Sequence, residues 1–241
     1  MSGHSHWSSI KRAKGAADQK RGKIFSKLAR QISVAARDKG GDIDANPTLR
    51  IVVEKAKSLN MPKENIERAI KKASGGLDEA KLEPFIFEAY GPEGIALIIE
   101  GITDNKNRAL GDIKQILNKN NGKLANEGSV RWMFERKGSI TIDNEQKKLA
   151  KEDLEIKAIE AEAEDFVWDN NNLHIFTKPE DLEKTKKSLE GQDLKVESVS
   201  LDWVAKEEIS LDEKGQGKAE SLFEALDEND DIQEIYSNLA G

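Results

Sequence analysis

The sequence contains no cysteine among its 241 residues. Disulfide bonds, thiolate metal sites and cysteine nucleophiles are therefore excluded. No run of 18 or more apolar residues occurs, so we expect no transmembrane helix. The basic residues near the N-terminus are followed by no apolar stretch, as a secretory signal would require. These absences favour a soluble, cytoplasmic protein with no membrane partner.

Common enzyme signatures are absent as well. The sequence has no G-x-S-x-G motif, no Walker loop and no H-E-x-x-H motif. His174 alternates with Leu173 and Ile175 in a predicted strand, which favours a structural role over that of a base. His4 and His6 have a metal-like spacing, but no cysteine or nearby carboxylate completes a site. We therefore expect a non-enzymatic protein without catalytic residues, metal, cofactor or small-molecule substrate.

Charge is abundant in this chain, and it is polarised along the sequence. Charged residues make up 34% of the chain, and the net charge is −7. Residues 1–76 contain 17 Lys and Arg but only 7 Asp and Glu, a net charge of +10, so the remainder carries −17. The asymmetry indicates a polyanionic partner for the basic end. The simpler alternative is an ordinary solvated surface.

The N-terminal third is predicted to be an arm followed by three helices. Glycines interrupt residues 1–22, which we interpret as an extended, mobile arm with at most a short helix. Apolar residues recur at helical spacing over residues 23–38. Asn46 and Pro47 are suited to the N-cap and the first turn of a second helix. Pro62 opens a third helix.

The residue pattern changes near residue 80, from helices alone to strands and helices. Residues 84–102 are predicted to form two strands joined by a turn at 91–94. An amphipathic helix follows over residues 104–120. Thr103 or Asp104 is the favoured N-cap of this helix, in preference to a role for Asp104 as a metal ligand or base.

The remaining elements predict a second α+β unit. Residues 129–142 are expected to form two strands broken at Gly138, and Asn170 lies in the turn of a hairpin. Residues 138–204 then follow the order β-α-β-β-α-β, which is typical of a ferredoxin-like domain. A last helix is predicted over roughly residues 216–228.

Several long motifs resemble those of the YebC/PmpR family, and the similarity runs from residue 2 to the C-terminus. In chain order the motifs are MSGHSHWSSIKRAKGAADQKRGKIFSKLARQISVAAR at 1–37, NPTLR at 46–50, NMPKENIERAIKKASGG at 60–76, TDNKNR at 103–108 and GSVRWMFERKG at 128–138.

The resemblance implies an α+β fold of three domains. An N-terminal all-α, three-helix domain would be followed by two α+β domains, of which the third is ferredoxin-like and is inserted into the second. The expected boundaries are 1–78 for the basic arm and helical domain, 79–137 plus 205–241 for the second domain, and 138–204 for the insertion. The residue patterns support the first and third domains, and the insertion follows from the resemblance alone.

The resemblance also implies a function. Members of the family are described as transcriptional regulators that bind DNA, whereas others, including a mitochondrial translational activator, act on translation. A ribosome-associated role in relieving stalled synthesis has been proposed for the family. His6 and Thr48 stand where a cation is common in the family, so these two positions are poor phosphate contacts.

We expect the nucleic-acid site on the basic arm and the first helix. Binding requires cations that track the phosphates and planar groups that stack on bases. Trp7 offers such a plane, although packing of its ring on the first helix is an equal alternative. The cations of the helix fall opposite its apolar face, so we expect a solvent-facing cationic stripe. The predicted nucleic-acid-binding residues are His4, His6, Trp7, Lys11, Arg12, Lys14, Lys20, Arg21, Lys23, Lys27 and Arg30.

Two further surfaces follow from charge. Arg108 lies in the first turns of a helix, where a cation is disfavoured, so Asn105 and Arg108 are candidates for a second binding surface. The acidic remainder of the chain repels nucleic acid. We expect it to face solvent or a basic protein, such as a ribosomal protein.

The sequence as a whole predicts a non-enzymatic, nucleic-acid-binding regulator of gene expression, namely a DNA-binding transcriptional regulator. The alternative is a translation factor associated with ribosomal RNA or the ribosome. Both functions would use the same basic end, and phosphate chemistry does not separate them. No helix-turn-helix with base-reading residues is recognisable, which disfavours sequence-specific DNA readout, whereas the family resemblance favours it.

Overall fold

The computed structural model describes residues 18–74, 82–144 and 149–240. Its first part, called here the helical region, consists of α2 (Asp18–Lys39), α3 (Pro47–Ser58) and α4 (Lys63–Ser74). Their apolar faces meet in one core around Ile32, Leu49 and Ile66. The three predicted helices are therefore confirmed. The predicted start of the first helix at residue 23 is five residues too late, because α2 begins at Asp18. The rest of the predicted arm lies outside the described residues.

A buried asparagine joins the first two of these helices. Asn46 has no exposed surface, and its side-chain oxygen accepts a hydrogen bond from the Leu49 N–H at 3.1 Å. Its amide donates to the carbonyl oxygens of Ala35 at 2.9 Å and Gly40 at 2.8 Å, near the end of α2. The predicted N-cap is confirmed, and the same side chain also fixes the turn between the helices.

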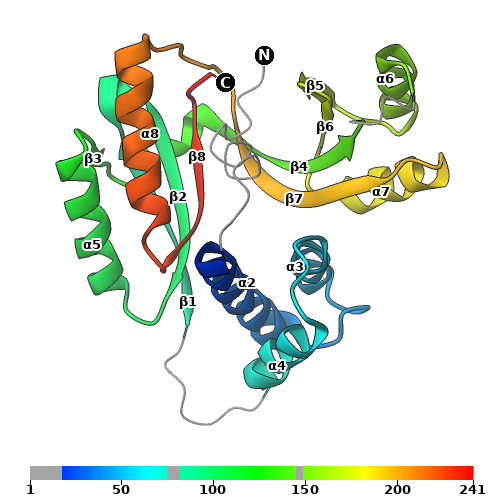
Figure 1. Cartoon of the computed structure of the whole chain (residues 1–241), viewed down its shortest axis with the longest axis horizontal. Coiled ribbons are helices and arrows are strands. Elements are labelled where there is room, and N and C mark those ends of the chain that lie inside the picture. The colour runs from blue at the N-terminus through cyan, green and yellow to red at the C-terminus, as the bar shows by residue number, and fades with distance from the viewer. Residues whose placement is uncertain (1–17, 75–81, 145–148, 241) are drawn as a thin grey trace.

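The first sheet, called here the β1 sheet, is antiparallel with the order β3-β1-β2-β8. Helices α5 and α8 cover one face of this sheet, and their apolar residues share its core (Figure 1). The turn between β1 and β2 is the short helix η1, where Glu93 and Gly94 have φ angles of 55° and 82°. The bounds are β1 Glu83–Tyr90, η1 Pro92–Gly94, β2 Ala96–Thr103, α5 Lys106–Lys119, β3 Lys123–Leu124, α8 Glu213–Asp227 and β8 Ile232–Ser237.

The second sheet, called here the β4 sheet, has the order β5-β6-β4-β7 and is also antiparallel. Together with α6 and α7 it has the order β-α-β-β-α-β, which confirms the ferredoxin-like prediction. The predicted hairpin is confirmed at Asn170, whose φ angle is 54°. The bounds are η2 Arg131–Met133, β4 Phe134–Asp143, α6 Lys151–Glu160, β5 Asp165–Asp169, β6 Asn172–Thr177, α7 Leu182–Gly191 and β7 Val196–Ala205.

Gly138 does not break a strand, and that prediction is wrong. β4 runs unbroken through it, paired with β6 on one side and with β7 on the other. A Cβ atom at this position would lie 2.4 Å from the Thr177 hydroxyl oxygen and 2.9 Å from the Leu182 Cβ. The glycine is therefore required by close packing of α7 and β6 on the strand. The terminal strand β8 was not predicted from the sequence at all.

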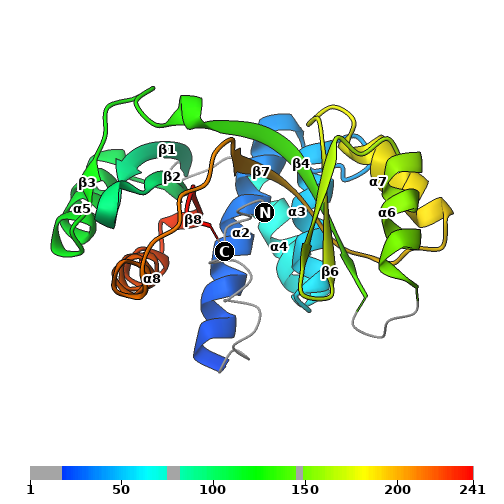
Figure 2. The same cartoon turned by 90° about the horizontal axis from the view of Figure 1, so that it is seen from above.

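The β4 sheet is inserted into the β1 sheet, because the chain leaves the first sheet after β3 and returns to it with α8 and β8. The domain boundaries at 78, 137 and 204 stay a prediction. The helical region lies between the two sheets, and the N-terminal end of α2 extends past the other elements (Figure 2). Within the described residues, no helix is long and apolar enough to cross a membrane.

Candidate nucleic-acid interface

The predicted nucleic-acid-binding residues fall into two groups. Those of the arm lie outside the described residues, and so does the side chain of Lys20, although its backbone belongs to α2. These are His4, His6, Trp7, Lys11, Arg12, Lys14 and Lys20. The second group, Arg21, Lys23, Lys27 and Arg30, is described on α2, where Arg21 is exposed.

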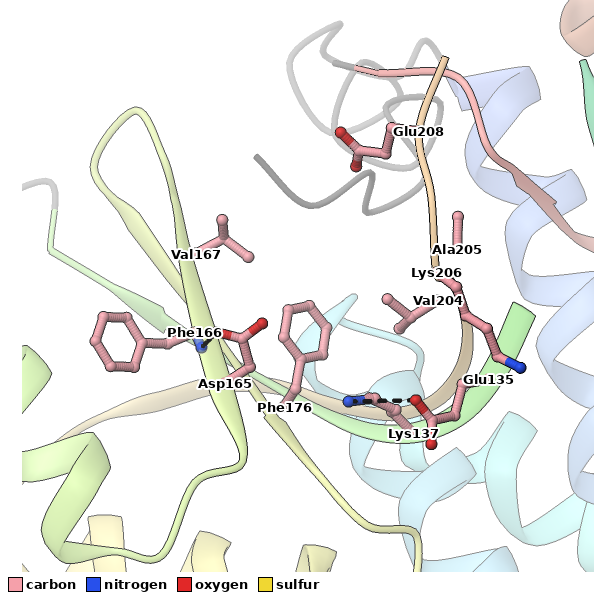
Figure 3. A pocket seen from close by; sticks show the side chains of 10 residues that line it. All are labelled: Glu135, Lys137, Asp165, Phe166, Val167, Phe176, Val204, Ala205, Lys206 and Glu208. Carbon is pink, nitrogen blue, oxygen red and sulfur yellow. Dashed lines mark hydrogen bonds and ion pairs between the residues drawn. The ribbon is translucent and has the colours of Figure 1, made fainter. Parts of the chain in front are cut away.

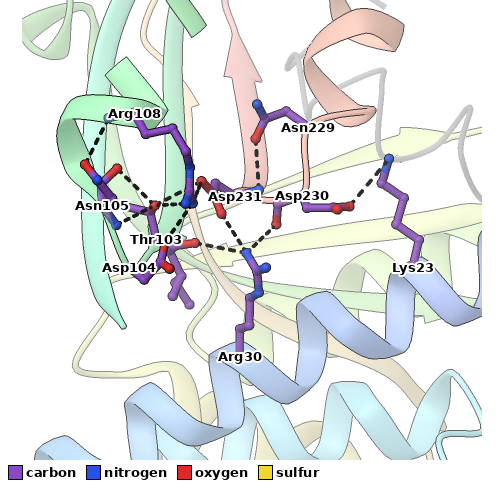
Figure 4. A network of polar contacts seen from close by, with 10 residues as sticks. Lys23, Arg30, Thr103, Asp104, Asn105, Arg108, Asn229, Asp230 and Asp231 are labelled. Carbon is purple, nitrogen blue, oxygen red and sulfur yellow. Dashed lines mark hydrogen bonds and ion pairs between the residues drawn. The ribbon is translucent and has the colours of Figure 1, made fainter. Parts of the chain in front are cut away.

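Lys23 contacts the segment that follows α8. Its Nζ donates to the carbonyl oxygen of Glu228 at 2.6 Å and lies 3.1 Å from a carboxylate oxygen of the same residue. It also lies 3.9 Å from the Asp230 carboxylate, toward which it points in Figure 4. Its side chain is 24% exposed. An intramolecular acid therefore lies where a phosphate was expected.

Lys27 is buried against the last turn of α8. Its Nζ donates to the carbonyl oxygen of Asp227 at 3.0 Å and to the Asp227 carboxylate at 2.8 Å. Only 8% of its side chain is exposed. The prediction of a solvent-facing stripe is wrong at this residue. The apolar face of α2 was correctly identified, but the opposite face packs on an acidic segment some 200 residues later in the chain.

Arg30 belongs to a network centred on the buried carboxylate of Asp231 (Figure 4). Arg30 donates to one oxygen of Asp231 at 2.8 Å and to the carbonyl oxygen of Asp230 at 2.9 Å. The other oxygen of Asp231 accepts hydrogen bonds from Arg108 at 2.8 Å and from the Thr103 hydroxyl at 2.9 Å. Burial alone would raise the pKa of Asp231, but these hydrogen bonds outweigh burial, and the pKa is lowered.

The candidate second surface has a local structural function. Asn105 is the N-cap of α5, because its side-chain oxygen accepts from the Arg108 N–H at 3.0 Å. The expectation that Thr103 or Asp104 is the cap is therefore wrong. The guanidinium of Arg108 bonds the Asp104 carboxylate at 2.7 Å as well as Asp231. These two carboxylates compensate a cation at the positive end of the helix dipole. A role of Asn105 and Arg108 in binding stays a prediction.

The acidic partners of α2 form one short segment, which we call the acidic loop. It comprises residues 227–231, with the sequence DENDD, at the C-terminal end of α8 and before β8. The run of acids is visible in the sequence, but its significance was missed because the acidic part of the chain was expected to face solvent or another protein. Its basic partner is α2 of the same chain.

A second set of ion pairs ties α3 to both sheets. Lys55 bonds Glu234 in β8 of the β1 sheet. Glu54 accepts from Lys186 in α7, which packs on the β4 sheet, at 2.7 Å. The apolar side chain of Ile51 adds a contact with the core of the β4 sheet. The helical region is thus held at two places: α3 by apolar and polar contacts, and α2 by the acidic loop.

Several cations of the helical region remain at the surface. The residues exposed in the structure are Arg21, Arg37, Lys39, Lys57, Lys63, Arg68, Lys71 and Lys72. Glu64 and Glu67 are interspersed among those of α4. Asp38, Asp42 and Asp44 are exposed as well, so the exposed surface of this region keeps a small positive excess even with the acidic loop in contact with α2.

A pocket of about 660 Å³ opens at one end of the β4 sheet (Figure 3). Phe176 forms part of its apolar lining, and its charged lining residues include Glu135 and Lys137, which lie 3.5 Å apart as an ion pair. Among the residues that the structure describes, no group of three or more His, Asp or Glu side chains is placed to hold a metal ion.

Two comparisons identify the family of this sequence. Residues 5–76 match the model of the TACO1/YebC protein N-terminal domain, and residues 82–239 match that of the TACO1/YebC second and third domain. A relative from Halothermothrix orenii named "probable transcriptional regulatory protein" is 45% identical, covering 99% of this chain and 94% of the relative. The "probable transcriptional regulatory protein YrbC" of Bacillus subtilis is 44% identical, covering 99% of each chain.

A solved structure has the same fold. The crystal structure of a conserved hypothetical protein from Aquifex aeolicus superimposes on this chain with a TM-score of 0.89 and 40% sequence identity. The match covers 98% of this chain and 97% of the other. The arrangement of the helical region and both sheets is therefore shared across almost the full length of both proteins.

Proposed function

Because the chain belongs to the TACO1/YebC family, we propose that it is a non-enzymatic regulator of gene expression that binds DNA through its helical region and the preceding arm. The curated relatives are named as probable transcriptional regulatory proteins, which supports the regulatory role. Nucleic acid as the partner is our inference from charge. The observation that carries it is the concentration of cations in residues 1–76, with a net charge of +10 in a chain of net charge −7.

The proposed contacts are of two kinds. The arm contributes Lys11, Arg12 and Lys14, which follow Trp7 in the sequence. The first helix contributes its exposed Arg21, next to Lys20 at the end that extends past the rest of the molecule. Lys23, Lys27 and Arg30 join these contacts only if they leave the acidic loop. Such an array positions a protein on the phosphate backbone and does not read bases.

Salt dependence of DNA binding tests the electrostatic claim. For a protein that neutralises about six phosphates of a duplex, log K falls against log[salt] with a slope of about −5. We expect such a slope for a short fluorescein-labelled duplex, measured by anisotropy. Replacing Lys11, Arg12 and Lys14 by Gln removes three of these contacts, so we expect the slope to become shallower by about 3.

A matched control variant loses the same number of positive charges from a different part of the surface. Lys178, Lys187 and Lys195 are exposed on the β4-sheet side of the molecule, and their replacement by Gln also removes three cations. We expect this variant to bind nearly as the parent does. A slope near zero for the parent, or an equal loss of affinity in both variants, would refute the proposed interface.

The nature of the target is decided by a parallel measurement. Single-stranded RNA of the same length and label is titrated under the same conditions, and a cell lysate is sedimented with and without nuclease. A preference for a defined duplex over competitor DNA supports the transcriptional role. A preference for RNA together with co-migration with ribosomal particles would mean that the same basic surface serves a role in translation.

A further inference from the structure

The acidic loop and the cations of α2 form a repeated pattern of contacts. Each of the three cations meets one backbone carbonyl oxygen and at least one carboxylate oxygen of the loop. Lys23 donates to the carbonyl oxygen and to one carboxylate oxygen of Glu228. Lys27 donates to the same two kinds of oxygen of Asp227. Arg30 bonds the carbonyl of Asp230 and the carboxylate of Asp231.

The chemistry of this segment resembles that of a phosphate chain. Carboxylates supply negatively charged oxygens, as the phosphates of a nucleic acid do. The carbonyl oxygens of Asp227 and Glu228 lie at the C-terminal end of α8, where the helix dipole adds negative potential. A lysine that donates to a carbonyl and a carboxylate oxygen here uses two of its three N–H groups on the loop, and the adjacent carboxylates repel a phosphate. Lys27, which is 8% exposed, is inaccessible to any external polyanion in this arrangement.

We propose that the acidic loop is an autoinhibitory latch, in which Asp227, Glu228 and Asp230 occupy the cations of α2 and compete with nucleic acid for them. The latch rests on the proposed function, since it regulates the same surface. Nucleic acid binds the arm and the exposed end of α2 first, and then displaces the loop from Lys23 and Lys27, while Arg30 stays bonded to Asp231. The two lysines are available to nucleic acid only in the opened form.

The structure separates the latch from the permanent joint beside it. The side chains of Glu228 and Asp230 are 77% and 75% exposed, so their ion pairs are weak and exchange readily with solvent. Asp231, in contrast, is buried and also binds Arg108 and Thr103 within the β1 sheet and α5. The side chain of Asp227 is 24% exposed, so its pair with Lys27 is better shielded from water than the other two. Changing these three acids while Asp231 is kept removes the latch and leaves the joint.

The central experiment is a triple variant, Asp227→Asn, Glu228→Gln and Asp230→Asn. The control is Glu213→Gln, Glu220→Gln and Glu224→Gln, three exposed acids of the same helix. Both variants change the net charge of −7 by the same amount, so general electrostatic attraction is matched. Binding of a short labelled DNA duplex and of single-stranded RNA is measured for both over a range of NaCl concentrations.

We expect the triple variant to bind about tenfold more tightly than the control, because a minor open form becomes the major one. In the control, salt also weakens the ion pairs that hold the loop, which partly offsets its effect on DNA binding, so the slope of log K against log[salt] should be steeper in the triple variant. Equal affinities and equal slopes for the two variants would overturn the latch.

A second readout does not depend on binding. The chain contains no cysteine, so two introduced cysteines, Ser26→Cys on α2 and Ser221→Cys on α8, are the only sites that a thiol-reactive nitroxide labels. Both positions are exposed, and the distance between the two labels is measured by pulsed electron paramagnetic resonance. We expect a narrow distance distribution in the parent background and a longer, broader one in the triple variant. The three control substitutions should leave the distribution narrow. Addition of DNA should shift it to longer distances in the parent background.

Failure of the latch and failure of the proposed function give different results. If the parent binds DNA or RNA but the triple variant matches the control, the latch is wrong and the proposed function stands. If no form binds either nucleic acid, the proposed function fails. The label distances then show what the acids do: an unchanged distribution in the triple variant means that they do not hold α2, and a broadened one means that they form a structural joint and not an autoinhibitory latch.

Discussion

A single carboxylate, Glu88 in β1, organises the loop between β3 and β4. It is 3% exposed and accepts backbone hydrogen bonds from Gly128 at 2.8 Å, Val130 at 2.6 Å and Arg131 at 2.9 Å. Burial alone would raise its pKa, but the three N–H donors and the Arg131 charge outweigh burial and lower it. The loop carries Trp132, which is 67% exposed, so a buried acid holds a large aromatic ring at the surface.

We predict that Glu88→Gln lowers the free energy of unfolding by about 3 kcal/mol at neutral pH, because the amide leaves backbone donors unsatisfied. The folded-state pKa of Glu88 lies below its unfolded value, so its contribution is complete above the unfolded pKa and is lost as pH falls through the folded pKa. Urea unfolding of parent and variant at a series of pH values checks both points. A stability difference that persists at the acidic end would contradict this charge-based account.

Asp202 in β7 behaves in the opposite way. Burial and the neighbouring Glu234 raise its pKa, despite a hydrogen bond from Ser200 at 2.9 Å. Its charged form therefore disfavours folding: the penalty is complete above the folded pKa, declines as pH falls through the folded pKa, and is gone below the unfolded pKa. We predict that Asp202→Asn raises the melting temperature at neutral pH and that the gain shrinks on acidification. A variant less stable than the parent at neutral pH would show that the pairing of Asp202 with nearby cations dominates.

Residue patterns predicted which side of α2 is apolar but not what covers the other side. Lys27 falls opposite the apolar face, as periodicity requires, and yet it is buried. Helical periodicity reports only that a side chain points away from its own core. Whether solvent or a segment 200 residues later lies there depends on tertiary packing, which the local pattern does not encode. The pairing of the acidic loop with Lys27 was therefore outside the reach of the sequence.

At the scale of elements, the two asparagine caps differ in how much they connect. Asn105 is exposed and closes only the first turn of α5. Asn46 is fully buried and bonds the end of α2 as well as the start of α3. The first is a local cap, and the second is a joint between two helices of the same core.

We therefore predict unequal costs for the same substitution. Asn105→Ala should lower the free energy of unfolding by about 1 kcal/mol, which is typical of an N-cap. Asn46→Ala should cost about 3 kcal/mol, because it also removes the two hydrogen bonds of a fully buried side chain to the carbonyl oxygens of Ala35 and Gly40. Chemical denaturation followed by circular dichroism measures both. Equal losses would mean that the contacts of Asn46 with Ala35 and Gly40 add nothing to its capping role.

Elements with strong local signals were predicted well from the sequence. The Asn46 cap, the hairpin at Asn170 and the strand and helix order of the β4 sheet all follow from short-range chemistry. The strand β8 was missed, because its six residues acquire their partner only through long-range pairing with β2. Gly138 was misread for a similar reason: the close approach of Thr177 and Leu182, distant in sequence, explains the glycine.

At the scale of the whole molecule, the helical region is held to the two sheets largely by charged side chains. Lys55 with Glu234 and Lys186 with Glu54 join α3 to one sheet each, and the acidic loop holds α2. The core of the helical region is built from its own three helices. A polar interface between separately cored units permits relative motion, so α3, with the apolar contact of Ile51, is the natural pivot when the loop releases α2.

We predict that the contribution of these ion pairs disappears at high salt. In dilute buffer, the variant Lys55→Gln with Lys186→Gln should be less stable than the parent by about 1 kcal/mol or somewhat more, since both pairs are partly shielded from water. At about 1 M NaCl the Debye length falls to about 3 Å, and the melting temperatures of parent and variant should converge. Scanning calorimetry measures the difference, and in high salt the helical region should begin to unfold as a transition of its own. If the difference between parent and variant is unchanged by salt, the two lysines act through the packing of their aliphatic chains, and the interface is not electrostatic. An interface that salt does loosen is also one that a polyanion can open.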